Sequence, residues 1–420
     1  MRGALDIAIA GAGPAGLATA LYLFRLGHRV HIFERFEVAR PIGSGLILQP
    51  TGQAVLADLG LLPAIHALAQ RIDRLDGRDA RSKRVVLAVR YDALRGQQHG
   101  LGVHRAALFG VLQEAVAAAG IPVQTGVEIA GVEAVTGGKS TLRLAGNRRV
   151  GAFDLVVDCT GAGTPLRPFA RDASSARPMA FGALWATVPW HDGGFDSHAL
   201  MQRYQGARVM IGVLPIGRHV IGGGELAAFF WSLRTDGYEA LRLTGFEAWR
   251  DRVARLWPET TSLLAALDSF DALTLARYQH ATMAEPVGEN LAFVGDSAHS
   301  TSPQLGQGAN MALLDAKALA IALETSSDVA SALVKYAALR RWHVRLYQAL
   351  SLSLTPFYQS DSRFLPVLRD LLVAYVARVP PAPKLLAAMV AGNLIDARKA
   401  LALPAREATD TQAVAGTFGG

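Results

Sequence analysis

Two clusters of glycine have the spacing that lets a polypeptide backbone hold a nucleotide. The first is Gly11-x-Gly13-x-x-Gly16, which lies between an apolar run at 7–10 and a helical pattern of apolar residues. In such a strand–turn–helix unit, the first glycine makes the tight turn, the second lets a pyrophosphate approach the backbone, and the third lets the helix pack on the strand. The helix N-terminus adds free N–H groups and a positive dipole end. We therefore expect Gly11, Gly13, Ala15 and Gly16 to bind the phosphates of a dinucleotide.

An acidic residue stands where the ribose of such a dinucleotide would lie. Glu34 closes the second apolar run of the unit, at 30–33, about twenty residues beyond the glycine turn. A carboxylate at this place accepts hydrogen bonds from both ribose hydroxyls of an unphosphorylated adenosine. The bound dinucleotide is therefore predicted to be FAD or NAD rather than NADP, and we expect Arg35 and the loop glycine Gly45 to contribute to its site.

The second glycine cluster narrows this choice. Gly295-Asp296 ends an apolar stretch, and a later glycine-rich segment opens a helix. A carboxylate at the end of a strand would repel phosphate, but it can accept a hydrogen bond from a hydroxyl group such as one on a ribityl chain. The helix start would stabilise the pyrimidine edge of a flavin ring, which becomes anionic on reduction. The residues expected to do so are Gly306, Gln307, Gly308, Ala309 and Asn310. The plainer alternative for this segment is a surface loop in which Asn310 caps a helix.

Taken together, these motifs resemble those of the FAD-dependent aromatic hydroxylases, the single-component flavoprotein monooxygenases typified by p-hydroxybenzoate hydroxylase. The resemblance covers most of residues 4–325 and includes Arg105, which matches the arginine that reaches the FAD phosphates in the family. It departs from the family at Thr160-Gly161, where an Asp-Gly pair is usual. Gly161 is still expected to contact FAD. Loss of the acid puts the NADPH contact in doubt, and Asp158 lies too far back along the strand to replace it.

The resemblance implies a reaction in which NADH or NADPH reduces the FAD. Reduced flavin and O2 would give a flavin hydroperoxide, which transfers one oxygen atom to an aromatic or polycyclic small molecule. Pro303, Gly306 and Gly308 are the candidates for the reactive face of the flavin. The base that would deprotonate a phenolic substrate is not evident, and His280 and Tyr204 are candidates that could line the substrate pocket.

We predict an α/β fold with a Rossmann-like FAD-binding domain, an inserted, mostly antiparallel β-sheet domain for the substrate, and a helical C-terminal segment. The FAD-binding domain is expected over residues 1–72, 98–170 and 286–352, and the substrate domain over 73–97 and 171–285. Within the substrate domain, strands are expected at 181–188, 209–214 and 220–221. Long helices are expected at 309–324 and 329–352. We expect proline-broken helices at 353–402 and a disordered tail at 403–420.

Composition limits the other functional classes. The chain of 420 residues is 51% hydrophobic and 18% charged, which is typical of a globular protein, and its net charge of +7 favours anionic partners. The basic residues are scattered, so nucleic acid is not predicted as a partner. The single cysteine, Cys159, excludes a disulfide within the chain, and no metal is expected. A cytoplasmic monomer or homodimer is the expected state.

Three alternatives remain open. The missing acid gives some weight to a flavin-dependent reductase or desaturase on the same scaffold. A second alternative is a ubiquinone-pathway-like hydroxylase at a membrane surface, because residues 353–402 carry Arg363, Arg369, Arg378 and Lys384 among apolar side chains. For this segment we favour a helical cap over the FAD domain or a dimer contact. A flavoprotein that binds FAD without turnover is the third.

Overall fold

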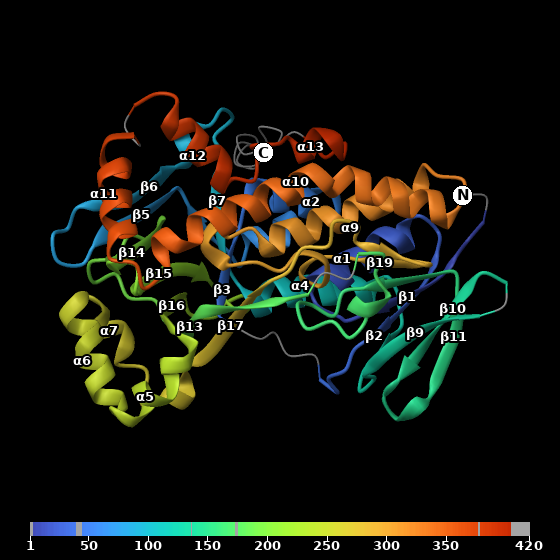
Figure 1. Cartoon of the computed structure of the whole chain (residues 1–420), viewed down its shortest axis with the longest axis horizontal. Helices are drawn as coiled ribbons and strands as arrows, with labels where there is room; N and C mark the ends of the chain where they lie inside the picture. The colour runs from blue at the N-terminus through green and yellow to red at the C-terminus, as the bar shows by residue number, and fades with distance from the viewer. Residues whose placement is uncertain (1–2, 39–43, 136, 173–174, 377–378, 405–420) are drawn as a thin grey trace, which may run out of the picture.

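The strands that precede the two glycine clusters belong to one parallel sheet (Figure 1). The computed structural model describes residues 3–38, 44–135, 137–172, 175–376 and 379–404. The strand order of this sheet is β18-β19-β12-β1-β2-β8, and only β18 is antiparallel to its neighbour. Its strands are β1 (Asp6–Ala10), β2 (Arg29–Phe33), β8 (Val123–Gln124), β12 (Leu155–Asp158), β18 (Val287–Gly288) and β19 (Leu291–Phe293). Because β1, β12 and β19 run parallel, the loops that follow them meet at one edge of the sheet.

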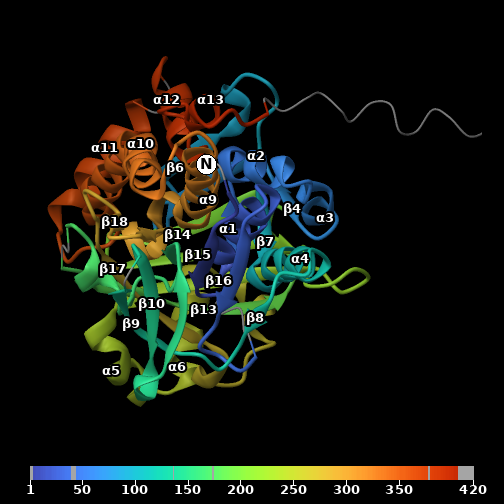
Figure 2. The same cartoon turned by 90° about the vertical axis from the view of Figure 1, so that its right-hand side faces the viewer.

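A layer of helices packs against this sheet and completes its apolar core. Helix α9 lies beside α1, α2 and α10, and the views of Figures 1 and 2 agree that α9 and α10 run side by side. The helices of this part are α1 (Pro14–Arg25), α2 (Pro50–Asp58), α3 (Leu62–His66), α4 (Arg105–Ala118), α8 (Asp296–His299), α9 (Gly308–Glu324) and α10 (Val329–Tyr358). The long helix expected to end at 352 continues to Tyr358. Pro356 does not stop it, because a proline in the last turn removes only one backbone hydrogen bond.

Two small sheets flank the parallel sheet. One is ordered β11-β10-β9 and the other β3-β7-β4. Their strands are β3 (Gly45–Leu48), β4 (Gln70–Ile72), β7 (Gly100–His104), β9 (Ile129–Val135), β10 (Lys139–Leu144) and β11 (Arg149–Phe153). The first of these stands apart as a twisted ribbon, whereas β3 and β7 contact β15 of the next sheet and so join the two halves of the molecule (Figure 1).

A seven-stranded, mostly antiparallel sheet forms the other half, in the order β17-β13-β16-β15-β14-β5-β6. It combines strands from 74–90 with strands from 177–280, as the predicted substrate domain does, and the division into domains stays a prediction. The strands are β5 (Arg74–Asp79), β6 (Val85–Arg90), β13 (Arg177–Pro189), β14 (Ala199–Gln205), β15 (Val209–Gly217), β16 (Leu226–Arg234) and β17 (Thr274–His280). The prediction of a strand at 220–221 is wrong. Val220 and Ile221 are exposed in the turn between β15 and β16, where they have no sheet face to bury.

Alternation along these strands gives the sheet two different faces. Leu184, Phe229 and Trp231 belong to a cluster that packs under α5 (Tyr238–Leu243), α6 (Phe246–Leu256) and α7 (Thr260–Leu264), which group below the sheet in Figure 1. Their chain neighbours Trp185 and Phe230 point to the opposite face, which borders a cavity. The sheet is therefore covered by helices on one face and open to a ligand on the other.

The C-terminal helices cover part of the seven-stranded sheet, not only the FAD-binding half. They are α11 (Phe364–Val376), α12 (Ala382–Val390) and α13 (Ala397–Ala400), and both α11 and α12 pack against β6. Arg369, which the less favoured membrane-surface alternative would place on an exposed patch, is 3% exposed and lies over the rings of Tyr204 and Tyr358. Arg378 and most of the predicted tail, 405–420, lie outside the described residues. Within the described part of the chain, no helix has the length and apolar character needed to cross a membrane.

Candidate active site

A continuous cavity of about 1120 Å³ lies between the edge of the parallel sheet and the open face of the seven-stranded sheet. Most of the residues predicted for the site line it. These are Gly11, Gly13, Ala15, Glu34, Arg35, Gly45, Arg105, Gly161, Tyr204, Asp296, Pro303, Gly306, Gly308 and Ala309. The predicted residues outside the lining are Gly16, His280, Gly295, Gln307 and Asn310. The geometry thus brings both glycine clusters to one space.

The glycines of the first turn differ in what their missing side chains allow. Gly11 has a φ of +98°, which favours glycine. A Cβ on Gly16 would lie 2.0 Å from the carbonyl oxygen of Gly11, so this position needs glycine for helix–strand packing. A Cβ on Gly13 would meet no protein atom within 4 Å. The Gly13 side therefore opens onto the cavity, where a phosphate could approach the backbone.

Glu34 is held at the cavity by two backbone N–H groups, one of them from the glycine turn. Its Oε2 accepts the N–H of Ala12 at 2.8 Å, and its Oε1 accepts the N–H of Phe36 at 3.1 Å. The residue is only 8% exposed. Each oxygen keeps a lone pair, so this fixed carboxylate can still accept hydrogen bonds from ribose hydroxyls.

The second turn presents a carboxylate to the same cavity. Gly295 has a φ of +71°, and Asp296 begins helix α8 directly after it. The Asp296 side chain is accessible from the cavity that it faces. Protein nevertheless surrounds the carboxyl on its other sides. The resulting desolvation raises the pKa of this carboxyl above its ordinary value. A hydroxyl donor from a ligand would satisfy such a carboxylate.

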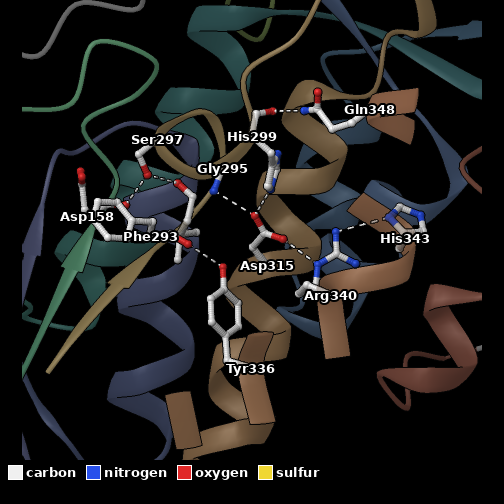
Figure 3. A network of polar contacts seen from close by, with 11 residues as sticks. Asp158, Phe293, Gly295, Ser297, His299, Asp315, Tyr336, Arg340, His343 and Gln348 are labelled. Carbon is white, nitrogen blue, oxygen red and sulfur yellow. Dashed lines mark hydrogen bonds and ion pairs between the residues drawn. The ribbon is translucent and has the colours of Figure 1, made fainter. Parts of the chain in front are cut away.

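A buried network fixes this turn from behind (Figure 3). The fully buried Asp315 accepts the N–H of Gly295 at 2.9 Å through Oδ2 and the Nε–H of Arg340 at 2.6 Å through Oδ1. His299 Nε2 lies 2.5 Å from Asp315 Oδ2. The backbone carbonyl of His299 accepts a hydrogen bond from the side-chain amide of Gln348 at 2.8 Å. Burial alone would raise the pKa of Asp315, but the charges of His299 and Arg340 hold it below its ordinary value. Sequence reasoning did not assign Asp315 and Arg340 a role in the site, because their contacts join segments that are distant in the sequence.

Asn310 and Gln307 hold loops together rather than facing the cavity. Asn310 Oδ1 accepts the N–H of Gln49 at 2.8 Å, and its Nδ2 donates to the carbonyls of Ile47 and Gly306 at 3.1 and 2.9 Å. Asn310 lies inside α9, so its interpretation as a helix cap is wrong; Gln307 occupies that position without a side-chain capping bond. Gln307 Nε2 donates instead to the carbonyl of Val390 in the C-terminal segment, at 2.6 Å.

Thr160 stands where the family usually has an acid, and its hydroxyl is hydrogen-bonded to a buried carboxylate. Thr160 lines the cavity, and both its N–H (2.9 Å) and its Oγ1 (2.7 Å) donate to Asp158 Oδ1. Asp158 is completely buried and also accepts a hydrogen bond from the Thr164 hydroxyl. Burial raises the pKa of Asp158. Asp158 does not reach the cavity, in agreement with the expectation that it cannot replace the family acid.

The two candidates for a substrate base do not have the geometry of one. Tyr204 is buried in the cavity wall and donates its hydroxyl proton to Gln202 Oε1 at 2.9 Å, and burial raises its pKa well above the ordinary value. His280 lies on the edge strand β17, opposite Arg177, and is outside the cavity lining. Tyr204 can therefore donate a hydrogen bond but not accept a proton, and His280 cannot reach a ligand in the cavity.

The described residues fit FAD, as three observations indicate. The Gly13 side of the first turn is open, the Asp296 carboxylate faces the cavity, and the Ser302 hydroxyl is buried in the lining without a protein partner. The N-terminus of the 17-residue helix α9 also borders the cavity through Gly308 and Ala309. Its dipole and free N–H groups suit an anionic ring edge. Sequence reasoning did not single out Ser302, although it directly precedes Pro303 in the second motif loop, and it missed Gln202 and Gln359, because no motif marks them.

Proteins of similar sequence are described as binding or depending on FAD. A family model described as "FAD binding domain" matches residues 4–346. The chain is 25% identical over 340 residues to the FAD-dependent urate hydroxylase of Klebsiella pneumoniae, with 80% of this chain and 86% of that one covered. It is 29% identical over 339 residues to the 6-methylpretetramide 4-monooxygenase of Streptomyces rimosus, which covers 74% of this chain and 73% of that one.

Solved structures share the fold. The K. pneumoniae protein HpxO, complexed with FAD and uric acid, superposes with a TM-score of 0.76 at 20% identity over 93% of this chain and 97% of that one. The tetrameric form of 2-methyl-3-hydroxypyridine-5-carboxylic acid oxygenase gives 0.75 at 19% identity over 91% and 96%. The predicted resemblance and fold class are confirmed. With a family model that spans four fifths of its length, the chain belongs to the FAD binding domain family of flavin-dependent hydroxylases.

Proposed function

We propose that this protein is an FAD-dependent monooxygenase that uses NADH or NADPH and O2 to hydroxylate an aromatic or polycyclic small molecule. The observation that carries the proposal is the continuity of the cavity. Nucleotide-type loops line one half, aromatic and aliphatic side chains of the seven-stranded sheet line the other, and the Pro303–Leu305 turn and Gly308 lie at the junction. Relatives named for urate and a pretetramide support a ring-shaped substrate.

The nucleotide half would hold FAD through backbone and carboxylate groups. The turn at Gly11 and Gly13 would receive the pyrophosphate, with Arg105 supplying positive charge, and Glu34 would accept the ribose hydroxyls. Asp296 would accept a hydroxyl of the ribityl chain. When bound, FAD supplies the redox chemistry with NAD(P)H and O2.

Around the reacting atoms, the chain's own groups would stabilise charge and exclude water. Gly306 has a φ of +61°, and it and Gly308 have no side chain that would keep a ring at a distance. The α9 N-terminus would stabilise negative charge on the adjacent ring edge. The apolar wall made by Leu214, Phe230 and Met389 would keep water from the reacting atoms.

The substrate half supplies positioning groups rather than a base. Among the described residues of the lining, none is a histidine, and the three tyrosines, Tyr204, Tyr278 and Tyr358, all have pKa values raised by burial. The proposed substrate is therefore electron-rich enough to accept oxygen without losing a proton to a side chain.

The test measures oxygen and reductant together. Purified protein is expected to carry FAD, and a screen of aromatic compounds with NADH and NADPH should find one that stimulates NAD(P)H oxidation, consumes O2 and gains one oxygen atom by mass. Product formation without O2 uptake would instead identify a reductase or desaturase. FAD binding with no stimulated oxidation by any compound would leave a non-catalytic flavoprotein and overturn the proposal.

A further inference from the structure

The substrate half of the cavity contains a buried amide without a protein partner. Gln359 directly follows helix α10 as its C-cap, is 5% exposed and lines the cavity. Neither its Nε2 nor its Oε1 makes a hydrogen bond to the described residues. A buried donor and acceptor left unpaired cost free energy, and a ligand recovers this free energy when it supplies both partners.

The polar side chains of Gln202, Tyr204 and Tyr278, which line the same half of the cavity, already have partners in the protein. The Tyr204 hydroxyl donates to Gln202 Oε1 at 2.9 Å, and the Gln202 amide contacts the sulfur of Met210 at 3.4 Å. The Tyr278 hydroxyl accepts the indole N–H of Trp185 at 2.9 Å. These bonds fix the side chains of the wall, whereas the Gln359 amide is left for whatever occupies the space.

The charge distribution of the cavity limits that occupant. The charged side chains in the described lining are Glu34, Arg35, Arg105, Glu128 and Asp296, and all of them belong to the nucleotide half. Arg369 lies behind the substrate half, over the rings of Tyr204 and Tyr358 at 5.1 and 5.3 Å, but it is outside the lining and donates to the carbonyls of Gly206 and Phe357. A carboxylate in the substrate half would lose its water without gaining a counter-charge.

The rest of the substrate half is apolar. The sheet contributes Leu75, Leu87, Leu200, Met210, Leu214 and Phe230, helix α10 contributes Leu354, and helix α12 contributes Met389 and Val390. Such walls bind a flat apolar ring system through buried area, and they leave orientation to the few polar groups.

We propose that Gln359 is a specificity-determining residue that pairs with a ring edge carrying an N–H or O–H donor beside a carbonyl acceptor. The substrate class is an uncharged, mostly apolar aromatic ring system with a lactam-type or hydroxy-carbonyl edge. This inference rests on the proposed monooxygenase function, and it adds the substrate chemistry and the residue that selects it.

The experiment compares binding of three matched probes to the FAD-loaded protein by calorimetry: 2(1H)-quinolone, quinoline and quinoline-2-carboxylate. The wild type should bind the quinolone, with its adjacent N–H and C=O, best and the carboxylate worst. Gln359→Met, which keeps the length of the side chain, should weaken quinolone binding about 10- to 100-fold and leave quinoline binding unchanged. Leu200→Ala is the matched control, since loss of an apolar contact should weaken quinolone and quinoline binding by the same factor.

A second variant keeps the inference testable if Gln359→Met does not fold. Gln359→Glu retains the acceptors but loses the donor while ionised, so its quinolone affinity should be low at pH 8 and recover as the buried acid becomes protonated at lower pH. Equal losses of affinity for quinolone and quinoline in the Gln359 variants, or no loss, would overturn the inference. The Gln359 amide would then bind water or have a purely structural role. These binding data do not depend on turnover, so an inactive protein that still shows the Gln359 pattern would contradict the proposed function and not the ligand chemistry.

Discussion

The carboxylate of Asp315 accepts the backbone N–H of Gly295 at 2.9 Å, although twenty residues separate the two in the sequence. This bond links the turn that presents Asp296 to the cavity with the middle of helix α9. The other Asp315 oxygen binds Arg340 of α10, so one buried carboxylate joins the motif turn to two long helices (Figure 3). The shape of the turn that presents Asp296 therefore depends on residues outside the cavity lining.

Removing the Asp315 charge should destabilise the whole protein. In Asp315→Asn, the guanidinium of Arg340, 2% exposed, would be buried without its counter-charge. We expect the free energy of unfolding, measured by urea denaturation, to fall by about 3–5 kcal/mol. Adding Arg340→Met should restore part of this loss, because it removes the unpaired cation. A double variant that is no more stable than Asp315→Asn would show that the ion pair does not account for the effect.

Two alanine substitutions in the first turn should separate cofactor binding from packing. Gly13→Ala places a Cβ where no protein atom lies within 4 Å, so apoprotein stability should be unchanged while FAD affinity falls about tenfold or more. Gly16→Ala places a Cβ 2.0 Å from the Gly11 carbonyl oxygen and should lower the unfolding free energy by about 1–3 kcal/mol or prevent folding. Flavin titration and thermal unfolding of the apoproteins measure the two effects, and equal FAD affinity for Gly13→Ala and the wild type would contradict the assignment of this turn.

These examples show which parts of the site the sequence could predict. The glycine turns and Glu34 follow from local geometry, because phosphate approach and tight turns restrict residue type at fixed spacing. Gln359 and Arg369 could not be predicted in this way, since their roles depend on how the C-terminal helices fold back onto β6 and the substrate sheet. The strand expected at 220–221 failed for a similar reason: its apolar residues have the right type, but the chain turns there between β15 and β16.

Replacing Thr160 with the acid usual in the family should harm this chain. Thr160→Asp removes a hydroxyl that donates to Asp158 at 2.7 Å and places a second carboxylate beside the buried one. The pair would then bind a proton more tightly in the folded than in the unfolded state, so the deficit in stability should be largest at pH 8 and shrink as the pH falls toward 5. Urea unfolding across this pH range measures it. Thr160→Ser keeps the hydroxyl and should behave like the wild type; a pH-independent deficit in Thr160→Asp would indicate a steric cause instead.

The buried His343 should make the protein sensitive to mild acid. Burial, followed by the charge of Arg340, lowers the pKa of His343 to about 3, and the ring is held between Arg340 at 3.4 Å and the carbonyl of Gly392 at 3.2 Å. Because the folded-state pKa is depressed below the unfolded value of about 6.5, the unfolded chain takes up the proton first as the pH falls. The His343 contribution is fully present above pH 6.5 or so and should decline by about 2 kcal/mol between pH 7 and pH 5. His343→Gln, which cannot be protonated in this range, should show a flatter dependence of unfolding free energy on pH over that interval. If the pH dependence of the unfolding free energy were the same in His343→Gln as in the wild type, another group would be responsible for the acid sensitivity.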